Sequence, residues 1–321
     1  MTLHKVIYDT DPGVDDAMAF VLETLHPEIE LIGVTSVFGN ATIDTTTRNA
    51  CYLAGRFAPA VPVARGAGAP LEGEAPTPLA AIHGDDGLGN IGPSEDGTVS
   101  PDARAASRFI IDSVRAHPSE VTIVAVGPLT NLALALAEDP SIVPLVKQVI
   151  VMGGAFGIGG VNGNVTPAAE ANMFGDPHAA DLVFGAAWPL TIVGLDVTHR
   201  VVMSTSYLAS IRDRGGVAGR FVWDVSRHYE AFHRDTENIE GIYVHDASAV
   251  AYLLAPQLFT VRKGPVRVLT EGIAAGQTIQ KPEGMPCAAP AWDARPSCNV
   301  CVGVDADGVL ALYERALCGA Q

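Results

Sequence analysis

Apolar and polar positions in the first forty residues follow the pattern of a strand, a helix and a second strand. Residues 5–9 are suited to a short strand, and a Pro-Gly turn follows at Pro12 and Gly13. Residues 29–37 are suited to the next strand. Strand, helix and strand within about 30 residues predict a βαβ unit and a parallel sheet. The helix is indicated by apolar residues that share one face at helical spacing, namely Val14, Ala17, Met18, Val21, Leu22 and Leu25.

The same alternation continues through the middle of the chain. Asp176 and Pro177 predict the start of a helix, since Asp is a capping residue and Pro suits the first helical position. We therefore expect an α/β fold with a doubly wound, mostly parallel (mixed) sheet, helices on both faces and a Rossmann-like core. No linker or repeat divides the chain, so residues 1–321 are expected to form a single domain. Further strands are predicted over 121–126, 148–152 and 190–195, and helices over 103–115 and 132–138.

Composition narrows the class of partner. Hydrophobic residues make up 48% of the chain and charged residues 17%, which excludes a disordered protein. The formal net charge of −16 argues against nucleic-acid binding, because there is no excess of Lys and Arg to neutralise phosphates. There is no signal-peptide pattern and no run near the roughly 20 apolar residues that span a membrane. We expect a cytoplasmic protein without a membrane or nucleic-acid partner.

The five cysteines do not indicate a disulfide framework, because their number is odd and they are scattered. Cys298 and Cys301 have the spacing of some zinc and redox sites, but no second pair accompanies them. Cys298, Val300, Val302 and Val304 alternate as in a half-buried strand. A strand is therefore the preferred interpretation of this segment.

Four acidic residues, Asp9, Asp11, Asp15 and Asp16, lie within eight positions at the carboxyl end of the first predicted strand. Ligands of parallel α/β sheets bind at that end. Helix capping and the helix dipole account for one or two acids at a helix start, but not for four. Carboxylates this close repel one another unless a cation lies among them. The cluster thus predicts a calcium or magnesium site.

Two kinds of chemistry remain open for such a site. Asp9-Thr10-Asp11 loosely resembles the Asp-x-Asp motif of haloacid-dehalogenase-like phosphatases, in which the first Asp is the nucleophile and magnesium bridges it to phosphate. The alternative is hydrolysis by a metal-held water molecule that an Asp deprotonates.

The longer segment from Asp9 to Ala17, Asp-Thr-Asp-Pro-Gly-Val-Asp-Asp-Ala, resembles the signature of the inosine-uridine-preferring nucleoside hydrolase family. These enzymes are nucleoside N-ribohydrolases. The later motifs of the phosphatases are not recognisable. The resemblance to the hydrolases continues in order through Thr35 to Asn40, His83 to Gly87, Gly127 to Asn131, Val151 to Gly154, Asn164 to Asn172, Gly194 to His199 and Val244 to Asp246.

The resemblance implies a calcium ion held by the side chains of Asp11, Asp16 and Asp246 and by the backbone carbonyl of Val126. A set of seven or eight oxygen ligands, completed by water and ribose hydroxyls, suits calcium better than magnesium. Asp11 is then the general base that deprotonates water, and Asp15 binds ribose hydroxyls.

Further positions match the ribose-binding residues of the family: Asn40, Asn164, Glu170 and Asn172. Amides and carboxylates suit a sugar that presents several hydroxyl donors and acceptors. Met152 matches a position under the sugar, although a Met at the end of a buried strand is an equally good interpretation.

His245 is implied to assist the leaving nucleobase, since a His with an ordinary pKa near 6.5 can act as an acid at neutral pH. Without the resemblance, His245 and Asp246 would be interpreted as packing and capping residues of the next helix. His83 lies in the glycine-rich stretch 76–93, which is implied to be a mobile flap with a His near the base. His83 is equally compatible with a solvated loop position.

Base preference is the least determined property. Residues 229–242 line the base pocket of relatives, and Tyr229, His233 and Arg234 do not restore both the Tyr and the Arg that some relatives carry. The three tryptophans do not follow the motifs of purine-specific relatives. The pairing of His83 with His245 favours pyrimidine or broad ribonucleoside use.

The resemblance thus implies calcium-dependent hydrolysis of the N-glycosidic bond of a small nucleoside substrate, by a homodimer or homotetramer. Two alternatives stay open at this point. One is a magnesium-dependent phosphohydrolase using Asp9, and the other is a non-catalytic nucleoside-binding protein.

Overall fold

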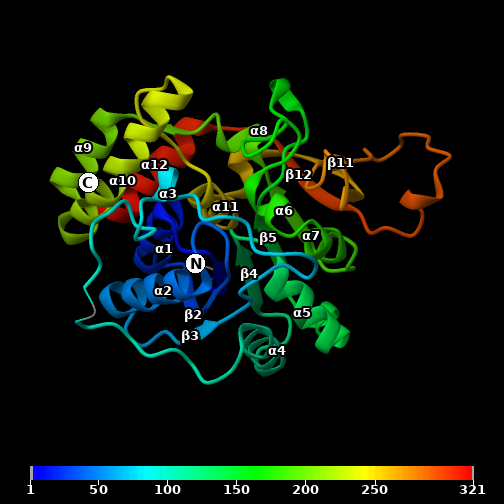
Figure 1. Ribbon diagram of the computed structural model, residues 1–321, viewed down its shortest axis with the longest axis horizontal. Helices are drawn as coiled ribbons and strands as arrows, with labels where there is room; N and C mark the ends of the chain where they lie inside the picture. The colour runs from blue at the N-terminus through cyan, green and yellow to red at the C-terminus, as the bar shows by residue number, and fades with distance from the viewer. Residues whose placement is uncertain (1–2, 95, 320–321) are drawn as a thin grey trace.

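Eight strands form one sheet that runs through both halves of the chain in the computed structural model, which describes residues 3–94 and 96–319 (Figure 1). Every neighbouring pair in this sheet is parallel except the last, β12–β9, so the predicted mostly parallel, mixed sheet is confirmed. In sheet order the strands are β3 (Val63–Arg65), β2 (Ile29–Ser36), β1 (His4–Thr10), β4 (Val121–Ala125), β5 (Gln148–Met152), β6 (Leu190–Val193), β12 (Cys298–Val304) and β9 (Phe259–Gly264). Two short antiparallel pairs stand outside it: β7 (Val202–Met203) with β8 (Ile242–Tyr243), and β10 (Val266–Val268) with β11 (Thr278–Gln280).

Helices cover both faces of this sheet because successive side chains of its strands point to opposite sides. In β1, Val6 and Tyr8 belong to one buried apolar cluster and Ile7 to the other. The first cluster includes residues of α1 (Val14–Leu25), α2 (Ile43–Phe57), α9 (Thr205–Arg214), α10 (Gly216–Phe232), α11 (Asp246–Leu254) and α12 (Ala306–Cys318). The second includes residues of α4 (Ala106–Ala116), α5 (Thr130–Glu138), α6 (Ala171–Gly175) and α7 (Pro177–Phe184).

Helix α1 is buried on more of its surface than its amphipathic pattern predicts. It packs against the helices α10, α11 and α12 as well as against strand β2 of the sheet. Figure 1 shows α9, α10 and α12 gathered at one end of the molecule. As a result, Glu23, which lies outside the predicted apolar face, is only 1% exposed, and neither of its carboxyl oxygens has a hydrogen-bond partner among the described residues.

Several predicted boundaries shift by a few residues for local reasons. Helix α4 begins at Ala106 rather than at 103, because Ala105 is extended and the Arg104 amide is held by the Asp102 carboxylate. Strand β6 ends at Val193, and the next residues turn into the short helix α8 (Leu195–Thr198). The long loop from 65 to 93 contains a further short helix, α3 (Ala80–His83).

Strand β12 confirms a strand at the cysteine pair but is covered on both sides. Cys298 and Val300 face one buried cluster and Cys301 the other, because β12 lies inside the sheet between β6 and β9. Both thiols are free and buried. The strand is therefore not half-buried along its whole length, as predicted, but buried on both faces over its first half.

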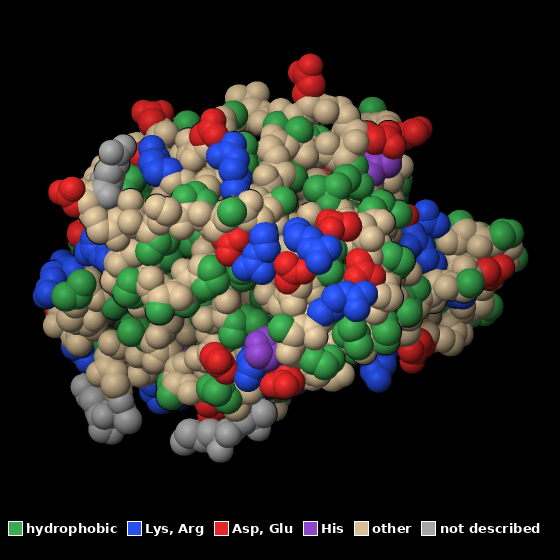
Figure 2. Space-filling view, turned by 90° about the horizontal axis from the view of Figure 1, so that it is seen from below, with side chains coloured by type: hydrophobic (Ala, Val, Ile, Leu, Met, Phe, Trp, Pro, Cys, Tyr) green, Lys and Arg blue, Asp and Glu red, His purple; other side chains and the backbone are tan. Residues whose placement is uncertain are grey.

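At the surface, Lys and Arg side chains are interspersed with Asp and Glu on the face shown in Figure 2. Ion pairs such as Arg108–Asp112, at 2.8 Å, are of this kind. Among the described residues, no helix has the length and apolar character needed to cross a membrane.

Candidate active site

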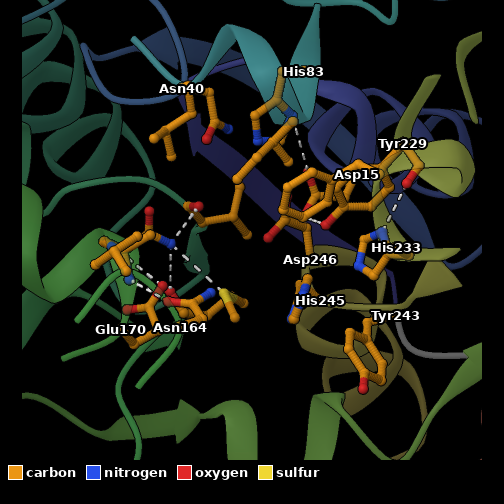
Figure 3. Close-up of a pocket in the computed structure, with 18 of the residues that line it drawn as sticks. Asp15, Asn40, His83, Asn164, Glu170, Tyr229, His233, Tyr243, His245 and Asp246 are labelled. Atoms are coloured by element: carbon orange, nitrogen blue, oxygen red, sulfur yellow. Dashed lines mark hydrogen bonds and ion pairs between the residues drawn. The ribbon is translucent and has the colours of Figure 1, made fainter. Parts of the chain in front are cut away.

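A cavity opens at the carboxyl ends of β1, β2, β4 and β5, where the sequence placed its candidate residues (Figure 3). Strand ends and the first turns of helices supply one wall, and α10, β8 and the start of α11 supply the other. Ten of the twelve candidate site residues line this cavity, all except Asp11 and Asp16: Asp15, Asn40, His83, Val126, Met152, Asn164, Glu170, Asn172, His245 and Asp246.

Three carboxylates form a compact acidic cluster at this cavity, and two of them, Asp15 and Asp246, line it. One oxygen each of Asp15, Asp16 and Asp246 lies within 4.8 Å of the others. Burial, followed by repulsion from Asp16, raises the pKa of Asp15 to about 8. Burial and the neighbouring carboxylates also raise the pKa of Asp246 well above its ordinary value. Burial disfavours the charged form of each acid, and the neighbouring negative charges add to this effect.

Asp16 is fixed within the cluster by three donors. Its carboxylate accepts hydrogen bonds from the Thr10 hydroxyl at 2.5 Å, the Gly13 amide at 3.0 Å and the Asn40 side chain at 2.9 Å. Two of these donors come from the turn that joins β1 to α1. The Pro-Gly turn therefore positions this acid, which explains why the loop and the acids occur together in the sequence.

Asp11 lies beside this cluster rather than within it. Asp11 lines an adjoining hollow, and Asn40 and Asn172 border both spaces. One Asp11 oxygen accepts the Asn40 amide at 2.7 Å, whereas Oδ1 is buried without a hydrogen-bond partner among the described residues. Burial, then repulsion from Asp16, raises the pKa of Asp11 well above its ordinary value. The structure thus brings Asp16 and Asp246 together with Asp15, and places Asp11 next to them.

The carbonyl of Val126 is held at the cavity by Asn172. The Asn172 side-chain nitrogen donates to the Val126 carbonyl at 2.8 Å and to the Met152 carbonyl at 3.1 Å. This one amide therefore ties the ends of β4 and β5 together and sets the spacing of the strand ends below the cavity.

Glu170 and Asn164 combine a place in the cavity with a role in building its wall. The Glu170 carboxylate caps α6 by accepting the amides of Asn172 and Met173, and it also accepts the amide of Gly154. The side-chain oxygen Oδ1 of Asn164 accepts a hydrogen bond from the backbone amide of Ala171, the first residue of α6, at 3.0 Å. Both side chains are thus hydrogen-bonded to backbone amides at the start of α6.

His83 is a buried residue of the cavity and not a solvated loop residue. Its Nδ1 accepts the Val14 amide at 3.2 Å, and its ring stacks on Tyr229 with centroids 5.6 Å apart. Burial lowers the pKa of His83 to about 3, so the ring is neutral at pH 7. Because Nδ1 accepts, the ring proton is on Nε2.

The glycines beyond His83 serve close packing as well as backbone geometry. Gly87 and Gly89 have φ values of 77° and 70°. A Cβ at Gly87 would lie 2.8 Å from the Asn49 side chain, and one at Gly89 would lie 2.3 Å from the Val225 carbonyl oxygen. At these two glycines the stretch that the resemblance implies to be a mobile flap packs tightly against α2 and α10.

His245 faces the cavity from the first turn region of α11. Its Nδ1 lies 2.8 Å from the Thr198 hydroxyl. Burial, followed by the nearby His199 and His233, lowers the pKa of His245 well below its ordinary value. The ring is therefore neutral at pH 7, unlike the ordinary histidine that the sequence suggested, and it can act as a hydrogen-bond donor rather than as a standing imidazolium.

On this side, Tyr229, Phe232 and His233 lie within the segment 229–242 that the resemblance assigned to the base pocket, whereas His199 and Tyr243 were not singled out from the sequence. His199 stacks on Tyr243 with centroids 4.3 Å apart, and Tyr229 contacts His233 edge-on at the same separation. Phe232 also lines the cavity. The sequence signal for His199 was its place just beyond a strand end, and Tyr243 directly precedes the matched segment Val244 to Asp246.

Other residues considered for the base pocket lie elsewhere. Arg234 is exposed and pairs with Asp235 at 3.1 Å. None of the three tryptophans, Trp188, Trp223 and Trp292, lines the cavity.

The position of Asp9 removes the phosphatase alternative. Asp9 is 0% exposed and does not line the cavity. One of its oxygens accepts the Thr35 hydroxyl at 2.5 Å and the Asn131 side chain at 2.8 Å. A nucleophile must reach its substrate, and Asp9 is instead a buried tie between β1, β2 and α5.

Comparison with known proteins agrees with this geometry. Residues 6–311 match the inosine-uridine preferring nucleoside hydrolase family. A probable uridine nucleosidase 1 of Oryza sativa subsp. japonica is 39% identical over 98% of this chain and 96% of its own length. The structure of a plant nucleoside hydrolase, 38% identical, superposes with a TM-score of 0.92 over 99% of each chain. A purine-preferring ribonucleoside hydrolase from Gardnerella vaginalis, 33% identical, gives a TM-score of 0.90 over 98% of each chain. The chain therefore belongs to the inosine-uridine preferring nucleoside hydrolase family and is an enzyme that hydrolyses the N-glycosidic bond of ribonucleosides.

Proposed function

We propose that this nucleoside hydrolase works with a calcium ion held by Asp11, Asp16, Asp246 and the carbonyl of Val126. The observation that carries the proposal is the set of buried acids at the strand ends. Asp11 and Asp15 each have a buried oxygen without a hydrogen-bond partner among the described residues. Buried carboxylates without partners are unfavourable unless a cation or a proton compensates them. The proposed ligand atoms are all oxygens, which suits a hard divalent cation.

When bound, such a cation polarises a water molecule and the ribose hydroxyls and lowers their pKa values. Asp11 is the residue that accepts the proton from water, because its Oδ1 is free and its other oxygen is held by the Asn40 amide. Fixing one carboxylate oxygen orients the second, so the base is in place before substrate binds.

The ribose is bound by Asp15, Asn40, Asn164, Glu170 and Asn172, with Met152 packed beneath it. The rigid hydrogen bonds of Glu170 and Asn172 to backbone groups support this role, since they fix the oxygens that face the sugar. Positive charge develops on the sugar as the glycosidic bond breaks, and carboxylate and amide oxygens stabilise it.

The leaving base departs on the side of His83 and His245. His245, whose ring is neutral at pH 7, assists by donating a hydrogen bond to the base as its negative charge develops. We propose a preference for pyrimidine or a broad range of ribonucleosides, which the name of the rice relative supports. The purine-preferring relative from Gardnerella shows that the fold also serves purines.

We further propose that the enzyme is a cytoplasmic homodimer or homotetramer. Size-exclusion chromatography with light scattering measures the oligomeric state directly, and a monomer at micromolar concentration would contradict this part of the proposal.

The function is tested by release of free ribose from uridine, cytidine, inosine and guanosine, with calcium and with a chelator. We expect release in calcium, its loss in chelator and its recovery when calcium is returned. Asp11→Ala should lower turnover by at least a thousandfold with an unchanged circular dichroism spectrum, because the base contributes to each turnover. Asp44→Ala, which removes an exposed acid paired with Arg65, is the matched control. Full turnover by Asp11→Ala would refute the mechanism.

A further inference from the structure

Thr198 makes a specific contact with the histidine on the leaving-base side of the cavity. It is the last residue of α8 and is 0% exposed. Its hydroxyl lies 2.8 Å from Nδ1 of His245, 47 positions later in the chain. Among the described residues, this is the only hydrogen bond of either side chain. A fully buried hydroxyl directed at one nitrogen of a cavity histidine suggests a role in the reaction.

Both sides of this contact are held in place by backbone hydrogen bonds. The Thr198 amide donates to the Gly194 carbonyl at 3.1 Å, and the Leu195 amide donates to the Gly154 carbonyl at 2.9 Å. Helix α8 is thereby fixed to the loop that follows β5. The residue before His245, Val244, donates its amide to the Val201 carbonyl at 3.0 Å. The hydroxyl and the imidazole thus meet between two rigid segments.

The contact determines which nitrogen of His245 faces the cavity. Rotation about the Cβ–Cγ bond of a histidine is roughly two-fold, so packing alone distinguishes poorly between a ring and its flipped form. The neighbouring rings of His199 and Tyr243 meet His245 edge-on, with centroids 5.5 and 5.9 Å away. The hydroxyl resolves the ambiguity, because the flipped ring would present a carbon to it.

The contact also bears on the position of the ring proton. When the hydroxyl donates to Nδ1, the proton of the neutral ring is on Nε2. Nε2 is then the donor that faces the cavity, which is the arrangement a departing base requires.

We propose that Thr198 is a positioning residue that holds His245 with Nε2 directed at the leaving base. This inference rests on the role proposed for His245. It predicts a dependence on the leaving group. The uracil anion is a poor leaving group and needs a hydrogen-bond donor to stabilise it. The p-nitrophenolate anion is a good leaving group and needs no such donor.

The test compares Thr198→Val, Thr198→Ser and His245→Ala on uridine and on p-nitrophenyl β-D-ribofuranoside, with the full chain in calcium. Thr198→Val should lower kcat on uridine about three- to tenfold, the equivalent of one neutral hydrogen bond, with little change in KM. Its kcat on the p-nitrophenyl riboside should stay within about twofold of the parent enzyme. Thr198→Ser should restore the uridine rate.

Thr191→Val is the matched control, because Thr191 is a buried threonine of β6 whose hydroxyl donates to the Tyr252 hydroxyl away from the cavity. It should leave both rates unchanged. If His245→Ala loses uridine activity and Thr198→Val does not, the inference is wrong and the role of His245 stands. If His245→Ala keeps full uridine activity, both are wrong. Equal losses by Thr198→Val on the two substrates would also overturn the inference, since they indicate damage to the fold.

Discussion

Glu23 offers a test of how the buried core tolerates an acid that no catalytic role explains. Both of its oxygens lack hydrogen-bond partners among the described residues, and the side chain is 1% exposed inside the packing of α1. Burial alone raises the pKa of Glu23 well above its ordinary value of 4.5. The folded protein therefore holds this carboxyl in its neutral form at pH values where the unfolded chain has lost the proton.

The sign and size of the effect follow from proton linkage. A carboxyl with a raised folded pKa contributes its full stability below the unfolded pKa of 4.5, and that stability is lost as pH rises toward the folded pKa. The loss is about 1.4 kcal/mol for each pH unit in this window. Glu23→Gln removes the ionisation and keeps the polar group. Glu23→Met also removes the polar group, which adds about 1–3 kcal/mol at every pH.

Urea unfolding of the parent, Glu23→Gln and Glu23→Met at pH 5, 6, 7 and 8 measures two contributions to the free energy of unfolding. One is the ionisation of Glu23, and the other is the burial of its polar group. The difference in the free energy of unfolding between Glu23→Gln and the parent should increase with pH. The free energy of unfolding of Glu23→Met should exceed that of Glu23→Gln by a constant amount. The other raised carboxyl groups are common to all three proteins and cancel in the differences. A gap that does not change between pH 5 and pH 8 would refute the reasoning, because it would show that Glu23 ionises equally in both states.

Two further predictions concern the site and its support. Calcium at 100 times its dissociation constant should stabilise the protein by about 2.7 kcal/mol. At one fixed calcium concentration, the rise in melting temperature should be larger at pH 8 than at pH 5.5, because the raised pKa values of Asp11 and Asp246 let protons compete with calcium at the lower pH; equal rises at the two pH values would contradict this. Asn131→Ala should destabilise the protein by about 2 kcal/mol or more in urea, because Asn131 bonds Asp9, the Ser36 carbonyl and the Ala67 amide. The exposed Asn162→Ala is its control, and similar unfolding midpoints for the two variants would contradict the structural role of Asn131.

The sheet and the acids that follow β1 were predictable because they depend on local patterns, whereas Asp246 was assigned only through the resemblance to the family. Apolar strands and helical spacing determine which segments enter the sheet, and a parallel sheet brings the residues after its strands to one edge. Asp15 and Asp16 follow β1 and Asn40 follows β2, so their convergence needed no knowledge of packing.

The other wall was not predictable in the same way. Tyr229, Phe232 and His233 reach the cavity because α10 packs across α1, and Tyr243 because β8 pairs with β7. These contacts join segments far apart in the chain, and no spacing within one segment encodes them. The burial of Glu23 has the same cause, since helices from the second half of the chain cover α1.

The side-chain amide of Asn172 connects one wall of the cavity, but not the other, to the central sheet. By binding the carbonyls of Val126 and Met152, it fastens the sugar-facing wall to the central strands. The opposite wall, in contrast, belongs to α10 and β8, which contribute no strand to the eight-stranded sheet. Substitutions in that outer wall can therefore accumulate without disturbing the strand ends. We therefore expect relatives of this enzyme to differ mainly in this outer wall. Changes there can alter which nucleobase is bound and leave the residues that cleave the glycosidic bond unchanged.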